Sequence, residues 1–200
     1  MKTPTQGMKP HLNLSVTMAL ASSLIATACA SYQPMTDNAM PKAMTAPVPA
    51  TIQVPAGNKM VLETLHTGEI KYQCRIKAGT DNQAAWLFIG PDARILKRDG
   101  NNSNKDIGRY YGPPATWEGT DGAKVVGMQV SVAPNGAANI PLQLVKITTS
   151  TGAGELAGTT FVQRLNTKGG VAPSGPCTVA SLNNTVFVPY QSDYIFWKAN

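Results

Sequence analysis

Apolar and polar side chains alternate along several short stretches of the chain, a pattern typical of β-strands with one buried face. The clearest stretch is residues 70–77, where every second side chain is apolar and the others are polar. A second stretch is residues 124–132, in which we expect one face to point to the core, formed by Val126, Met128, Val130 and Val132. Further strands are predicted at residues 84–89, 140–147, 156–165 and 186–197.

Gly, Asn and Asp separate these stretches at intervals of about ten residues, which is typical of antiparallel domains with short strands. Asn135-Gly136 predicts a hairpin between residues 124–132 and 140–147. We therefore predict an all-β fold, mainly an antiparallel β-sandwich or a barrel-like sheet. The one place where we allow a short helix is residues 91–96.

The first 28 residues have the pattern of a secretory signal peptide. Lys2, Lys9 and His11 precede an uncharged stretch, residues 12–28, which is rich in Leu, Ala, Ser and Met. A basic start, an apolar middle of this length and small residues at its end are what translocation and cleavage require. The stretch is too polar for a membrane span. The sequence therefore predicts export.

The leader ends in Leu24-Ile25-Ala26-Thr27-Ala28-Cys29, which resembles the lipobox of bacterial lipoproteins. The resemblance predicts a lipid anchor on Cys29, and Ala30 after it favours the outer membrane. The alternative is cleavage by ordinary signal peptidase at the same small residues, which gives a periplasmic or secreted protein. We expect a lipoprotein of the cell envelope that faces the periplasm and meets the membrane through Cys29.

Residues 29–50 are rich in Pro, Met and Ala and have no apolar period, so we predict a tether. Residues 51–200 remain as a single β domain. The net charge of +6 includes two leader lysines, and without them 15 basic and 11 acidic side chains give +4. The basic residues are spaced out, so we do not expect nucleic acid as a partner.

The three cysteines are Cys29, Cys74 and Cys177. Cys74 lies on the apolar face of its predicted strand, so its thiol is expected to point to the core. In an exported chain we expect Cys74 and Cys177 to form a disulfide. The alternative is two separate buried thiols, which behave as small hydrophobic groups.

Familiar catalytic and metal-binding patterns are missing from the sequence. After the leader, His66 is the one histidine, and we interpret it as an exposed residue of a turn at Thr67-Gly68. No spacing of His and Cys fits a zinc site, and no nucleophile elbow or phosphate loop is present. We therefore assign no catalytic residue, no metal and no cofactor.

Residues 108–125 read GRYYGPPATWEGTDGAKV. This segment resembles the GPTWE..DGS.V motif of a secreted bacterial and fungal family, domain of unknown function 3455. Further segments agree with that family in order and spacing, over about residues 51–197: residues 54–57, 72–74, 86–93, 163–173 with Cys177, and 188–196. The resemblance implies an exported, mostly β domain with a disulfide, and it supplies no active site.

Several amphipathic side chains in these motifs lie near predicted loops and form a candidate ligand cleft: Tyr110, Tyr111, Trp117, Glu118, Arg164, Tyr190 and Tyr194. Aromatic faces beside an arginine suit a glycan or another small polar ligand. The alternative is that the aromatic rings close the ends of the fold and Arg164 pairs with a carboxylate. We expect a binding or structural role with an envelope glycan or protein as partner. The alternative function is an envelope glycan hydrolase that uses Glu118 or Asp121.

Overall fold

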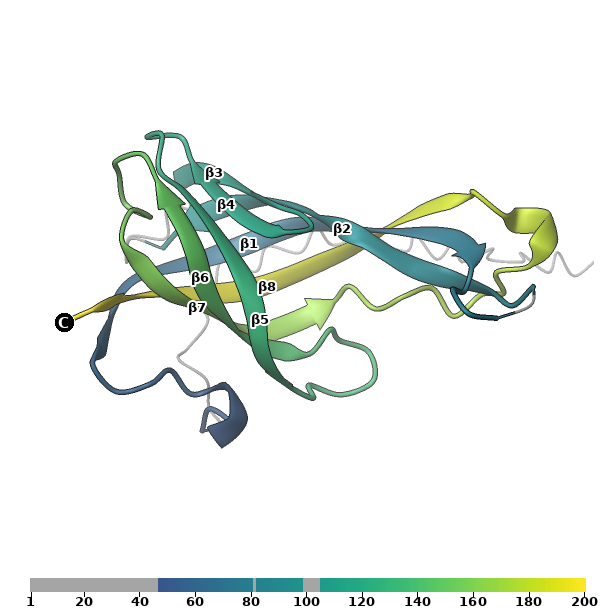
Figure 1. The fold of residues 1–200 in the computed structure, drawn as a ribbon, viewed down its shortest axis with the longest axis horizontal. Coiled ribbons are helices and arrows are strands. Elements are labelled where there is room, and N and C mark those ends of the chain that lie inside the picture. Colours follow the sequence, from purple (N-terminus) through teal and green to yellow (C-terminus); the bar gives the residue numbers. More distant parts are fainter. Residues whose placement is uncertain (1–46, 81, 99–104) are drawn as a thin grey trace, which may run out of the picture. The chain divides into compact units, whose positions relative to one another are not determined.

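The computed structural model describes residues 47–80, 82–98 and 105–200 (Figure 1). The chain divides into two units, Met1–Asp37 and Asn38–Asn200, and all described residues belong to the second. The signal peptide 1–28, the anchor residue Cys29 and most of the tether 29–50 lie outside the described residues, so they stay predictions. None of the described helical segments has the length and apolar character needed to cross a membrane.

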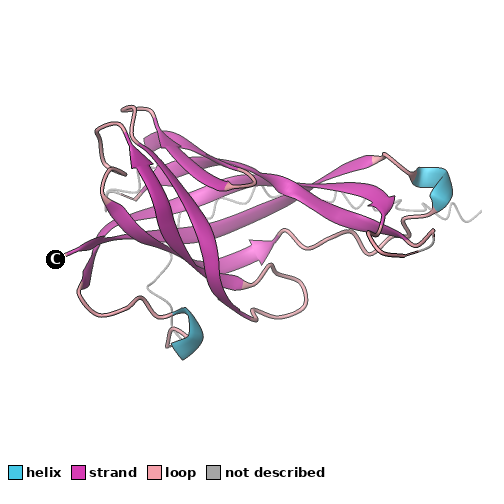
Figure 2. Ribbon diagram, in the orientation of Figure 1, coloured by secondary structure: helices cyan, strands magenta, loops and turns pink. Residues whose placement is uncertain are grey.

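Eight antiparallel strands follow one another around a closed barrel, in which β1 pairs with both β2 and β8 (Figures 1 and 2). The all-β prediction is confirmed, and of its two forms the structure has the barrel. The strands are β1 (Asn58–Ile76), β2 (Ala84–Lys97), β3 (Lys105–Tyr111), β4 (Ala115–Gly119), β5 (Lys124–Ala133), β6 (Leu142–Thr151), β7 (Thr159–Gly169) and β8 (Thr185–Ala199).

The short helix that we allowed at residues 91–96 is wrong, because β2 continues through this range. Ala93 and Ile95 are buried while Asp92 and Arg94 are exposed, which is the alternation of a strand. The helical segments of the described chain are two single 3-10 turns, η1 (Ala50–Ile52) and η2 (Val179–Ser181).

The hairpin of β5 and β6 is confirmed, but the predicted inner face of β5 is wrong. Met128 is 65% exposed and Val130 55% exposed, whereas Val125 and Gly127 are buried. A side chain at Gly127 would collide with Val145 of β6, so this face has no room for anything larger. The valines and methionine that alternate along β5 therefore point away from the core over most of the strand.

Two apolar clusters stabilise the barrel. The larger fills the interior and includes Trp117, Tyr194 and Phe196, all with 0% exposure. The smaller lies where the segment before β1 packs on β5 to β8, and its centre is the fully buried Ile52 of η1. The Gln163 side chain donates a hydrogen bond to the Ile52 carbonyl over 2.7 Å. Residues next to the predicted tether are therefore part of the folded domain.

The strands β1, β2 and β8 are the longest and extend beyond the others at one end (Figure 1). The disulfide Cys74–Cys177 ties the loop before η2 to this extension, across 103 positions of the sequence, and confirms the predicted pair. The Trp86 indole donates to the Gly175 carbonyl over 2.9 Å, which holds the same loop against β2.

Candidate functional site

A cavity of about 420 Å³ opens at the end of the barrel where the β3–β4 turn and the β5–β6 connection lie. Seven strands, β1 to β7, this turn and this connection contribute residues to it. Most of the lining is apolar or aromatic, and the polar groups are few. The lining residues are Ile70, Tyr72, Phe88, Pro91, Tyr110, Gly112, Pro113, Ala115, Gly127, Gln129, Ile140, Pro141, Gln143, Val145 and Arg164.

Three aromatic side chains form the wall and floor of this cavity. Tyr72 and Phe88 meet edge to face with ring centroids 6.1 Å apart, and Phe88 is 53% exposed. The Tyr72 hydroxyl donates to the Gly170 carbonyl over 2.7 Å, which fixes its ring. Tyr110 is buried and stacks on Trp117 at 4.8 Å. The cavity therefore offers rigid aromatic surface, part of which is open to solvent.

Arg164 on β7 is the charged residue of the lining. Its Nε and one terminal nitrogen donate to the Pro141 carbonyl over 3.1 and 2.8 Å. No carboxylate of the described residues lies within 4.0 Å of its guanidinium, so the alternative in which Arg164 pairs with a carboxylate is wrong. The positive charge at the cavity is therefore held in place but not neutralised.

The tyrosines near Arg164 do not supply a compensating negative charge. Burial raises the pKa of Tyr72, Tyr110 and Tyr190, although the Arg164 charge acts in the opposite direction on all three. These phenols therefore stay neutral near pH 7. The cavity is lined by neutral groups around one cation.

Below the cavity floor, a second layer of polar aromatic side chains fills the barrel. The His66 ring stacks on Tyr194 with centroids 3.8 Å apart and lies 5.5 Å from Tyr110. Neither His66 nitrogen has a hydrogen-bond partner among the described residues, and the same holds for the hydroxyls of Tyr190 and Tyr194 and the Trp117 indole nitrogen. Burial lowers the pKa of His66 well below its ordinary value, so the ring is neutral.

The prediction that His66 is an exposed turn residue is wrong. Its side chain has 0% exposure, and β1 passes straight through Thr67-Gly68. Gly68 pairs with Ala93 of β2 at a point where a Cβ atom would collide with the β2 backbone. The glycine is needed for a close approach of two strands rather than for a turn.

The structure separates the seven predicted cleft residues into three groups. Tyr110 and Arg164 line the cavity. Trp117, Tyr190 and Tyr194 are buried in the barrel interior next to Tyr110 or His66. The remaining two are away from the cavity: the Tyr111 hydroxyl donates to Glu118 Oε2 over 2.7 Å, and Glu118 is exposed.

The two carboxylates considered for catalysis do not line the cavity. Asp121 accepts the Ala123 amide (3.1 Å) and the Glu155 amide (2.7 Å), and these bonds tie two turns together. They hold the pKa of Asp121 below its ordinary value, and the Tyr111 hydrogen bond does the same for Glu118. A general acid at neutral pH needs the opposite shift.

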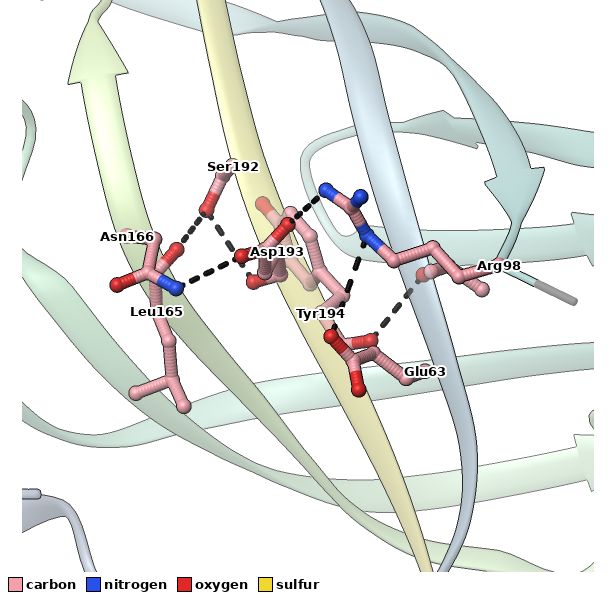
Figure 3. Close-up of polar contacts among 8 residues, drawn as sticks. Glu63, Arg98, Leu165, Asn166, Ser192, Asp193 and Tyr194 are labelled. Atoms are coloured by element: carbon pink, nitrogen blue, oxygen red, sulfur yellow. Dashed lines mark hydrogen bonds and ion pairs between the residues drawn. The ribbon is translucent and has the colours of Figure 1, made fainter. Parts of the chain in front are cut away.

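A separate polar cluster joins residues of β1, β7 and β8 to Arg98, which directly follows β2 (Figure 3). Arg98 reaches across β1 and contacts Asp193 of β8 at 2.6 Å; their side chains are 9% and 3% exposed. Asn166 of β7 donates to the other Asp193 oxygen over 2.7 Å, and Glu63 of β1 lies 4.0 Å from Arg98. The cluster ties the end of β2 to β1, β8 and β7, and we assign it to the fold rather than to ligand binding.

Sequence reasoning missed most of the lining, including Tyr72, Phe88 and the glutamines Gln129 and Gln143. Tyr72 shares the inward parity of Cys74 on β1, which is a signal for the interior but not for a cavity. Among the described residues, no group of three or more His, Cys, Asp or Glu side chains comes together as a metal site.

The closed ring of eight antiparallel strands in sequence order, with a cavity open at one end, defines an up-and-down β-barrel domain. The chain belongs to the family described as protein of unknown function (DUF3455), which matches residues 55–198. No curated protein and no solved structure matches the chain.

Proposed function

We propose that this protein is an exported, lipid-anchored protein of the cell envelope whose β-barrel domain binds a small amphipathic molecule. The observation that carries the binding role is the cavity of about 420 Å³ at the open end of the barrel. Barrels of eight strands are either filled by their side chains or hold one small ligand. Ligand sites have volumes of about 300 to 1,000 Å³ and are mostly apolar with a few polar groups.

The leader and the lipobox-like end at Cys29 support export and anchoring in the outer membrane, facing the periplasm. The disulfide is consistent with an oxidising compartment. Metabolic labelling with a tagged fatty acid tests the anchor: wild type should be labelled and Cys29→Ser should not. An unlabelled wild type would instead support a periplasmic or secreted protein.

A neutral fluorescent probe tests the binding role. N-phenylnaphthylamine brightens in apolar sites, and its ring system is small enough for the cavity. We expect saturable binding that Ala115→Phe weakens, since Ala115 lines the cavity and a phenyl ring there would fill it. Ala85→Phe is the matched control, because Ala85 lies on β2 away from the lining and is also partly exposed.

Equal binding by wild type and Ala115→Phe would refute the cavity as the site. The alternative of an envelope glycan hydrolase that uses Glu118 or Asp121 stays a prediction. Turnover of peptidoglycan fragments by wild type, lost in Glu118→Gln or Asp121→Asn, is the result that would support it.

A further inference from the structure

We infer that the cavity selects an amphipathic anion, with its carboxylate or sulfonate on Arg164 and its apolar body against Tyr72, Phe88 and Tyr110. The inference rests on the proposed binding function and adds the chemical class of the ligand. It depends on three observations: the charge of the lining, the free donors of Arg164 and the exposed aromatic rim.

The charge of the lining favours an anion. Arg164 is the charged group among the lining residues, and no described carboxylate lies within 4.0 Å of it. A cationic ligand would meet repulsion without a partner, and a neutral ligand would leave the guanidinium charge without a counter-ion. An anion gains a charge-assisted hydrogen bond in a site that is partly shielded from water.

The geometry of Arg164 leaves donors for such a ligand. A guanidinium has five N–H groups in a planar fork. The Pro141 carbonyl takes one from Nε and one from a terminal nitrogen, which leaves three for a ligand. The two contacts to Pro141 also restrict the side chain, so less freedom is lost when an anion binds.

Neighbouring polar groups complete the recognition of an acid group. Gln143 donates its amide to the Gln129 side-chain oxygen over 2.7 Å, and both side chains line the cavity. The pair adds neutral hydrogen-bonding groups without adding a negative charge. The phenols near Arg164 are neutral as well, so no negative charge in the described lining competes with an anionic ligand for the cation.

The aromatic rim indicates an apolar body rather than a free inorganic ion. Phe88 is 53% exposed although its ring meets Tyr72, and Tyr110 closes the floor. Ile70, Val145 and Ile140 add aliphatic surface. Covering the apolar surface of a ligand with such a lining is favourable. Phosphate or sulfate alone has no apolar surface to cover.

A pair of probes that differ by one charged group tests the inference on the full-length protein. Anilinonaphthalene sulfonate carries the rings of N-phenylnaphthylamine plus a sulfonate. We expect wild type to bind the sulfonate probe about tenfold or more tightly than the neutral probe, since a hydrogen bond to a charged group is worth that much. Arg164→Gln should remove this preference, and Arg164→Lys should keep part of it because the charge remains.

Arg94→Gln is the matched control, since it removes the same charge from an exposed ion pair with Asp106, away from the lining. It should keep the preference. A preference that Arg94→Gln lowers as much as Arg164→Gln would overturn the inference, because it would reflect overall charge. Equal affinity of wild type for both probes would also overturn it while the proposed binding role stands. Binding of either probe that Ala115→Phe does not weaken would overturn the binding role itself.

Discussion

Protonation of His66 should cost the folded barrel stability as the pH falls below about 6.5, the ordinary pKa of histidine. The imidazole is fully buried between Tyr194 and Tyr110, and neither nitrogen has a partner among the described residues. A charge on this ring would be desolvated without any compensating group. The folded protein therefore keeps His66 neutral, while the unfolded chain takes up the proton.

The size of the effect follows from proton linkage. A histidine whose folded pKa is lowered has no cost above its unfolded pKa, and stability is lost progressively as the pH falls from the unfolded pKa towards the folded one. One proton bound by the unfolded chain alone changes the free energy of unfolding by about 1.4 kcal/mol per pH unit. Between pH 7.5 and 5.5, His66 should therefore lower the stability by about 1.4 kcal/mol, because the unfolded histidine is mostly protonated only in the lower part of this range.

The assay is urea unfolding of wild type and His66→Phe at a series of pH values from 7.5 to 5.5. His66→Phe keeps an aromatic ring against Tyr194 and removes the titration, and His66→Leu serves if the larger ring does not fit. The difference in unfolding free energy between wild type and variant should change by about 1.4 kcal/mol across the series. Other groups cancel in this difference, including Glu63, whose pKa is raised by burial and by Asp193. If the free energies of unfolding of the two proteins change equally with pH, the histidine is not buried as a neutral group and the reasoning fails.

Three further perturbations test what stabilises the fold. Replacing Cys74 and Cys177 together by Ala should lower the free energy of unfolding by about 4 to 5 kcal/mol in the chain-entropy model, since the bridge closes a loop across 103 positions; an unchanged urea midpoint would contradict this. Asp193→Ala breaks a buried ion pair and should lower the free energy of unfolding by about 3 to 5 kcal/mol. Glu63→Gln should lower it by less than about 1 kcal/mol, because Glu63 lies farther from Arg98. Equal losses in urea unfolding would refute the assignment of the Arg98–Asp193 pair to the fold. Ile52→Ala should cost about 2 to 5 kcal/mol if the segment before β1 is part of the domain, and a loss below about 0.5 kcal/mol, typical of a surface position, would show that it is not.

The sequence predicts the parts of this fold where one strand face is apolar and the other polar. On β1 the alternation of Ile70, Tyr72 and Cys74 identifies the inner face correctly. The same parity continues back through His66 to Leu62, and all of these side chains are buried. With Thr67-Gly68 interpreted as a turn, the predicted strand begins only after it. A glycine where two strands approach closely cannot be told from a turn glycine by sequence alone.

On β5 the alternation gave the wrong face because both faces are made of small or apolar residues. Val125 and Gly127 face the interior, whereas Met128 and Val130 are exposed. Near Gln129 the register with β6 shifts, and a shift of one residue exchanges the two faces of a strand. Such a shift depends on the partner strand, so the pattern within β5 does not reveal it.

The cavity is formed by many strands together, so no single segment of the sequence predicts it. Three of its lining positions, Gly112, Ala115 and Gly127, have at most a methyl group, and Ala115 pairs with Gly127 across β4 and β5. Tyr72 of β1 and Arg164 of β7 come from strands far apart in the sequence, and they reach the same cavity only when the ring of strands closes. Local sequence patterns explain each small residue as a turn or a tight contact. The site therefore follows from closure of the barrel. Since Ala115 faces the cavity, Ala115→Phe should weaken probe binding more than it lowers the free energy of unfolding.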